Sequence, residues 1–250
     1  MIELGPGVRC VSPGLVAVQL ASKLPKLELL MLLSELLGLY AISPDREADM
    51  NPRTKPILST QDLQELLGKM SGARGVGAVR RALKIAPINA ASPMEAKLYL
   101  RTTIPCSQGG YGLGNVILND PVGIGRLSES IKELRIRKPD LLFLGVDSSK
   151  KRGVCLDYMG AHHQSQVICD TVRRNELIAN GFSPYEIYKE HYDNIDYMDA
   201  LMSQIRSELG LPSHETTRWR SDLERERRMA LWHELEEIDM QAWVRDARLR

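Results

Sequence analysis

The chain has 250 residues, of which 43% are hydrophobic and 26% charged, and its formal net charge is +1. This balance is ordinary for a globular protein and excludes a strongly basic, dedicated nucleic-acid-binding protein, although local basic patches are compatible with it. The most apolar run, residues 24–40, contains three charged side chains and is too short to span a bilayer.

None of the four cysteines is in CxxC spacing, so we expect no zinc site, and the apolar neighbours of Cys155 and Cys169 predict buried free thiols there. The first residues lack the basic start and the apolar core of a signal peptide. Both features favour a reduced cytoplasmic setting. The cysteines are Cys10, Cys106, Cys155 and Cys169.

Residues 1–87 are predicted to form a helical region without a constellation of titratable groups. Ser12 followed by Pro13 is typical of a helix start, and residues 26–40 are apolar around most of a helix. Charged residues and prolines predict a loop over 43–58. The remaining expectations are a short strand at 8–11, a helix over 61–70 capped by Ser59 or Thr60, and a helix ending near Ala86.

Ser92-Pro93-Met94-Glu95 has the pattern of a capping box, with serine at the N-cap and glutamate three positions later. Four glycines within 105–115 predict a flexible loop, because no Gly-Lys-Ser/Thr follows as a phosphate-binding loop requires. A strand is expected at 116–118. The basic residues between 132 and 138 are either a solvated loop edge or a contact for a DNA backbone.

Two apolar runs flank a turn in the middle of the chain. Asp140 opens the first run, 141–146, and Asp157 lies inside the second, 154–159. A carboxylate within an apolar strand is costly to bury unless it is paired or holds a cation. Adjacent antiparallel strands lie about 4.8 Å apart. We therefore expect Asp140 and Asp157 to lie side by side and to hold a divalent metal.

An apolar stripe at helical spacing predicts a helix over 164–181 that ends at Gly181. Asp170, Arg173 and Arg174 lie three and four positions apart on it, which is typical of ion pairs along one helix. In the functional interpretation, Asp170 points toward the histidine pair at 162–163 and the arginines contact phosphate.

Residues 183–192 predict an edge strand, and 195–209 an amphipathic helix closed by Gly210. After a linker, the charged segment 217–249 has sparse apolar positions and predicts a long helix. This helix either docks one face on the protein or mediates dimerisation.

Pro139-Asp140, LDYMGAHH and DTVRRN together resemble the Vsr-like branch of the PD-(D/E)xK nuclease fold. The C-terminal domains of AbiEi-type abortive-infection antitoxins and actinobacterial endonuclease-domain proteins carry a similar E-Y-Q-G-x-H-H and D-x-x-R. SPMEAKLYL, at 92–100, is similar to the helix that opens such domains. The resemblance covers roughly residues 88–190.

The resemblance implies an α/β fold of the α+β type, in which a restriction-endonuclease-like mixed sheet is flanked by helices over 88–210. The helical region 1–87 precedes this domain and a charged C-terminal helix, 211–250, follows it. Related proteins often carry a winged-helix reader upstream, which residues 1–87 do not match. The chain is then either a shortened member or one whose start is truncated.

For the site, the resemblance implies Mg²⁺ bound by two aspartates, with Glu95 as a third ligand that competes with its capping role. His162 or His163 would move protons, together with Asp170. Alternatively, one of the histidines only caps the following helix.

Two departures from the nuclease pattern bear on activity. Met159 stands where the pattern has lysine, and Asp157 is shorter than the usual glutamate by roughly 1.3–1.5 Å. One hypothesis is therefore a metal-dependent endonuclease acting on DNA. The alternative is a catalytically degenerate module that serves as an antitoxin or transcriptional regulator in a phage-defence system, with a cognate toxin as partner. A third hypothesis is a decayed gene product without activity.

Overall fold

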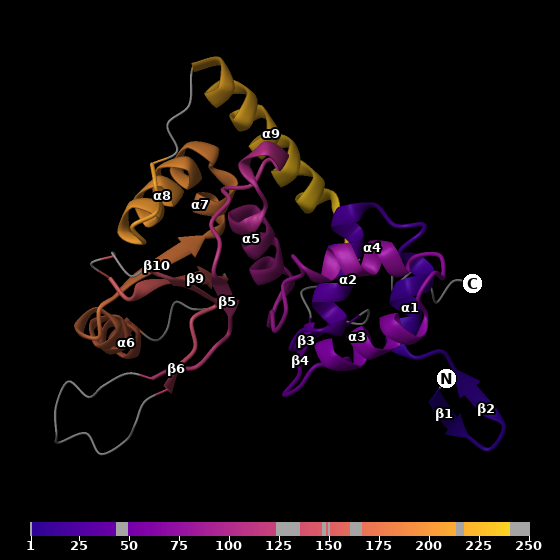
Figure 1. The fold of residues 1–250 in the computed structure, drawn as a ribbon. Coiled ribbons are helices and arrows are strands. Elements are labelled where there is room, and N and C mark those ends of the chain that lie inside the picture. Colours follow the sequence, from indigo (N-terminus) through magenta and orange to yellow (C-terminus); the bar gives the residue numbers. More distant parts are fainter. Residues whose placement is uncertain are drawn as a thin grey trace. The chain divides into compact units, whose positions relative to one another are not determined.

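The computed structural model describes residues 2–43, 50–123, 136–146, 149, 151–160, 167–213 and 218–240. The chain has the expected α+β composition, with helices and a four-stranded mixed sheet (Figure 1). It divides into two compact units, residues 1–100 with 233–250 and residues 101–232. No helix within the described ranges is long and apolar enough to cross a membrane.

The first unit contains four whole helices and two short hairpins within the described residues, together with parts of two helices that continue into the second unit. Ser59 caps one helix, because its Oγ accepts a hydrogen bond of 3.0 Å from the backbone N–H of Asp62. Leu30, Leu63 and Val79 are fully buried in its core. The helices are α1 (Pro13–Leu20), α2 (Lys26–Leu36), α3 (Thr60–Lys69) and α4 (Val76–Leu83), and the hairpins are β1 (Ile2–Gly5) with β2 (Val8–Cys10) and β3 (Tyr40–Ile42) with β4 (Met50–Pro52).

Two expectations for this unit are wrong. The helix predicted over 26–40 ends at Leu36, and Tyr40–Ile42 form a strand instead. Its partner β4 lies inside the segment 43–58 that was predicted to be a loop. The buried hydroxyl of Tyr40 lies 2.6 Å from Ser34 Oγ, which holds the chain back against α2. This contact fixes the turn that follows the helix.

The second unit contains a sheet in the order β10-β9-β8-β5. β10 is parallel to β9, whereas β9 with β8 and β8 with β5 are antiparallel. Its strands are β5 (Val116–Leu118), β8 (Leu141–Leu144), β9 (Gly153–Met159) and β10 (Phe182–Tyr188), and β6 (Val122–Gly123) pairs separately with β7 (Ile136–Arg137). The helices are α5 (Pro93–Thr103), η1 (Cys106–Gln108), α6 (Val167–Ala179), α7 (Lys189–Asp193), α8 (Ile195–Glu208) and α9 (Arg218–Glu237), and the division between the units falls within α5 and α9.

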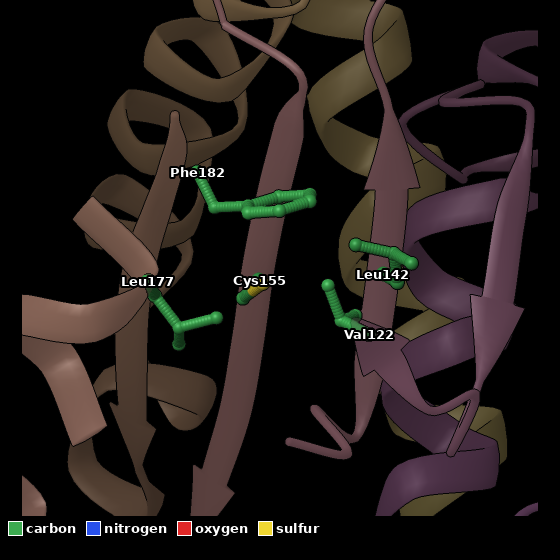
Figure 2. Close-up of a cluster of buried hydrophobic side chains, with 5 residues drawn as sticks. All are labelled: Val122, Leu142, Cys155, Leu177 and Phe182. Carbon is green, nitrogen blue, oxygen red and sulfur yellow. The ribbon is translucent and has the colours of Figure 1, made fainter. Parts of the chain in front are cut away.

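Helices cover both faces of this sheet, which explains why its central strands are continuous apolar runs. On one face, Leu142 and Cys155 pack with Leu177 of α6 and Phe182 of β10, together with Val122 (Figure 2). On the other face, the hydroxyl of a β10 tyrosine donates a 2.6 Å hydrogen bond to Glu208 of α8. The helix α6 provides the long crossover that two parallel strands need.

Several sequence expectations for this unit are confirmed. The strand at 116–118 and the helix after the second apolar run are present. Gly181 and Gly210 follow their helices with φ of +83° and +70°, a conformation that glycine adopts without the cost of a side chain. The C-terminal segment, predicted as a helix over 217–249, is helical over Arg218–Glu237, where Leu231 and Leu235 are buried. Residues 241–250 lie outside the described residues, and the choice between docking and dimerisation stays a prediction.

The edge strand predicted over 183–192 is present as β10, an outer strand of the sheet, but only as far as Tyr188. Its predicted end is wrong, since Lys189–Asp193 form helix α7. Pro184 lies in its middle, opposite Cys155 of β9. A proline within a sheet is tolerated on an outer strand, because the missing N–H does not have to pair inward.

We predict that Gly153→Ala destabilises the protein by about 2–3 kcal/mol, because β8 and β9 approach closely at this position. A Cβ on residue 153 would lie 2.3 Å from the carbonyl oxygen of Phe143. The matched control is Gly160→Ala, where a Cβ meets nothing within 4 Å. Denaturant unfolding should place the control within about 0.5 kcal/mol of the wild type. Equal stability of the two variants would contradict the packing argument.

Candidate active site

The structure brings Asp140 and Asp157 together at one end of the β8–β9 pair. Leu141 lies opposite Leu156, so the residues just beyond them come to face each other. The backbone N–H of Asp140 donates to Asp157 Oδ1 at 3.0 Å, and the N–H of Tyr158 donates to Asp140 Oδ2 at 2.7 Å. Each carboxylate therefore accepts a hydrogen bond from the opposite strand.

The two aspartates project from the sheet face that α6 covers. Side chains alternate along a strand, so Asp157 shares its face with Gly153 and Cys155. Burial, followed by the negative charge of Asp157, raises the pKa of the Cys155 thiol to about 12. This thiol is therefore protonated near neutral pH and does not offer the thiolate that nucleophilic attack or metal binding needs.

Arg173 of α6 reaches Asp157 across this face. Its Nη2 lies 2.9 Å from Asp157 Oδ2 and also donates to the carbonyl oxygen of Lys138 at 3.3 Å. Of the two adjacent arginines, Arg173 is thus turned toward the sheet, whereas Arg174 is exposed. The side chain of Asp170 lies outside the described residues, so the pairing expected along the helix is untested.

The donor set at this point is compatible with a hard divalent cation. Mg²⁺ is commonly bound by one or two carboxylates, and waters and substrate phosphate complete its coordination. Asp140 and Asp157 provide two such carboxylates. Within the part of the chain that the structure describes, no three His, Cys, Asp or Glu side chains group closely enough to hold a metal. His162 and His163 lie outside the described residues.

Glu95 takes part in the start of helix α5. Its Oε2 accepts a hydrogen bond of 2.8 Å from the backbone N–H of Ala91, and its own N–H donates to Ser92 Oγ at 3.1 Å. In a capping box the glutamate carboxylate accepts from the N–H of the N-cap residue, and the N-cap side chain accepts from the N–H of the glutamate. Here the second bond is present, whereas the first comes from Ala91, one residue before Ser92. The capping interpretation is confirmed, and the ligand role of Glu95 stays a prediction from the resemblance.

One acidic residue of this sheet face was missed by the sequence analysis. Glu186 of β10 lies opposite Asp157 in the parallel register, and its Oε2 accepts from the hydroxyl of Tyr188 at 3.4 Å. Three neighbouring strands therefore carry a carboxylate in one row. The available signal was the alternation in β10, which places Glu186 on the face of Phe182. The alternation alone does not show that Glu186 lies beside Asp157, because this also requires the register between β10 and β9.

Comparison of the chain with models of protein families, with curated proteins and with solved structures found no match.

We predict that Arg173→Ala lowers the free energy of unfolding by about 1 kcal/mol, since the ion pair with Asp157 is partly exposed and therefore partly screened. The adjacent Arg174→Ala is the matched control and should change stability by less than about 0.5 kcal/mol. Chemical denaturation of both variants in low and high salt checks this. A loss of equal size in both would mean that the Asp157 contact contributes nothing measurable.

Proposed function

We propose that this protein is a metal-dependent, endonuclease-like enzyme that acts on DNA phosphodiesters. The observation that carries the proposal is the convergence of Asp140 and Asp157 at facing positions of two adjacent strands. The mixed sheet between helices supports it, because the resemblance to the Vsr-like branch of the PD-(D/E)xK fold implies such a core. The proposal places the protein in the cytoplasm, where DNA is its substrate.

In this proposal Asp140 and Asp157 hold Mg²⁺, with Glu95 as the third ligand that the resemblance implies. When bound, the ion would supply a hydroxide nucleophile at neutral pH and stabilise charge on the phosphoryl oxygens. His162 or His163, together with Asp170, would transfer the protons of the reaction.

Arg173 has a particular role in the proposed mechanism. Its guanidinium is held at the carboxylate pair by Asp157 and by the carbonyl of Lys138. Guanidinium groups bind phosphate oxygens in two-point geometry. We propose that Arg173 exchanges its contact with Asp157 for a phosphate oxygen of the substrate, and that Arg174 contacts the strand beside it.

We predict that Asp140→Asn and Asp157→Asn each lower Mg²⁺-dependent nicking of supercoiled plasmid by about 100-fold or more. Asparagine keeps an oxygen that can accept the cross-strand hydrogen bond, so both variants should remain folded. Glu190→Gln, on exposed α7, is the matched control and should nick at the wild-type rate. Intact plasmid with wild-type protein in both Mg²⁺ and Mn²⁺ would overturn the enzymatic proposal.

A gain of function is the second expectation. Met159→Lys places the ammonium group of the nuclease pattern two positions after Asp157, at a half-buried site where a lysine can extend toward water. We predict at least about a tenfold rise in nicking rate, from stabilisation of the developing negative charge. The same assay with Met159→Gln, which matches the length without the charge, should give no such rise.

A non-catalytic module is the alternative function, and a specific contact favours it. The 2.9 Å ion pair with Arg173 already supplies Asp157 with a positive partner. Under this alternative the protein is an antitoxin or transcriptional regulator that binds a cognate toxin or an operator. Calorimetric titration with MnCl₂ separates the two: saturable binding that Asp140→Asn removes supports the enzyme, and no binding heat together with toxin or operator binding supports the module.

A further inference from the structure

A second site lies within the unit of residues 101–232, where a pocket of about 500 Å³ opens among the glycine-rich loop, α8 and α9. This volume falls within the range of small-molecule sites. The loop contributes Cys106 and Tyr111, and the two helices contribute Arg206 and Arg228. None of these residues takes part in the carboxylate site on β8 and β9.

Both arginines are fixed in place by contacts at the pocket wall. Nη2 of Arg206 donates to the carbonyl oxygen of Tyr111 at 2.6 Å. Nε of Arg228 lies 2.9 Å from Asp199 Oδ1, and its guanidinium carbon is 5.5 Å from the centroid of the Tyr111 ring. A guanidinium has five N–H donors, and these contacts use only some of them. Two oriented cations of this kind are arranged in advance for an anion.

The charges at the pocket leave a positive excess among its lining side chains. Asp199 is the one carboxylate among the lining residues that the structure describes, against two guanidinium groups. It is already shared, because it accepts from the Tyr111 hydroxyl at 2.8 Å and lies 3.4 Å from Arg225 Nη1. Outside the lining, Arg225 pairs with Asp196 and Asp199, and the charge of Glu224 acts on Cys106. The two guanidinium groups at the wall would therefore attract an anion at close range, rather than the overall charge of the surroundings.

Four serines also line the pocket. Ser203 and Ser207 lie one turn apart on α8, and the lining also includes Ser213 and Ser221. A phosphate ester offers three oxygen atoms that accept hydrogen bonds from several sides, which this combination of arginines and hydroxyls provides. Met202 and Leu211, which also line the pocket, supply an apolar part for the rest of a ligand.

Cys106 does not make this pocket a thiol-based active site. Burial, followed by the charge of Glu224, raises the pKa of its thiol, so that the thiolate is disfavoured.

We propose that this pocket binds a phosphorylated small molecule of about the size of a mononucleotide. Arg206 and Arg228 contact the phosphate, and the serine hydroxyls complete its hydrogen bonds. The inference does not depend on the proposed nuclease activity, since the two sites share no residue.

Isothermal titration of the full-length protein tests the proposal with AMP, inorganic phosphate, pyrophosphate and adenosine as probes. We expect saturable binding of AMP and none of adenosine. Ser203→Glu and Ser207→Glu place a negative charge in the pocket at exposed helical positions, where glutamate preserves the helix. Each should weaken AMP binding at least about tenfold through like-charge repulsion. Ala230→Glu, at an exposed position of α9 outside the lining, adds the same charge and should bind as the wild type does.

Three results would overturn the inference. The first is no binding heat with any phosphate-bearing probe at millimolar concentration, and the second is equal AMP affinity in Ser207→Glu and Ala230→Glu. The third is binding of a short DNA strand, weakened by Ser207→Glu, without binding of AMP, which would make the pocket a contact for a nucleic-acid backbone. Asp157→Asn should leave AMP binding unchanged, so failure of the nuclease proposal and failure of this one remain distinguishable.

Discussion

The antiparallel register of β8 and β9 decides where two carboxylates can meet in this protein. A slip of one residue would turn Asp157 to the opposite face and also turn Leu156 and Cys155 out of their packing. Because the flanking residues are buried on both faces, such a slip would exchange side chains between two packed faces and disturb the packing of each. The packing of the apolar residues in β8 and β9 therefore holds Asp140 and Asp157 next to each other, although two neighbouring carboxylates repel.

The same placement creates a competition for Asp157. Its carboxylate accepts a cross-strand N–H through one oxygen and pairs with Arg173 through the other. In the proposed enzyme, a divalent ion at this carboxylate would compete with Arg173 for the second oxygen. The proposal would thereby link metal binding to the contact between Asp157 and α6, the helix that carries Arg173. It also explains how one arrangement of residues is compatible with both a catalytic and a non-catalytic module.

Local signals in the sequence predicted much of this fold. Ser59 and Gly181 marked helix ends because capping and positive φ depend on residues close in sequence. The β3–β4 hairpin was missed because three-residue strands show too little alternation to identify. The adjacency of Asp140 and Asp157 was predictable because only a turn separates their strands.

Contacts between distant segments could not be predicted in the same way. The sequence offered Arg173 either a pair within its helix or a substrate phosphate, and neither interpretation included Asp157 of β9. This partner depends on how α6 packs on the sheet. Glu186 joined the row of carboxylates only through the parallel register of β10. The arginine pocket draws on a loop and two helices that lie far apart in the chain.

The outer position of β10 has a consequence for the behaviour of the protein at high concentration. An exposed strand edge is a template on which a second molecule can add its own strand. Pro184 interrupts that edge, because it lacks a donor and holds the backbone away from the geometry of an incoming strand. The charge of Glu186, two residues later, would repel the same residue of an identical chain. Pro184 and Glu186 therefore disfavour aggregation of the protein through this edge of the sheet.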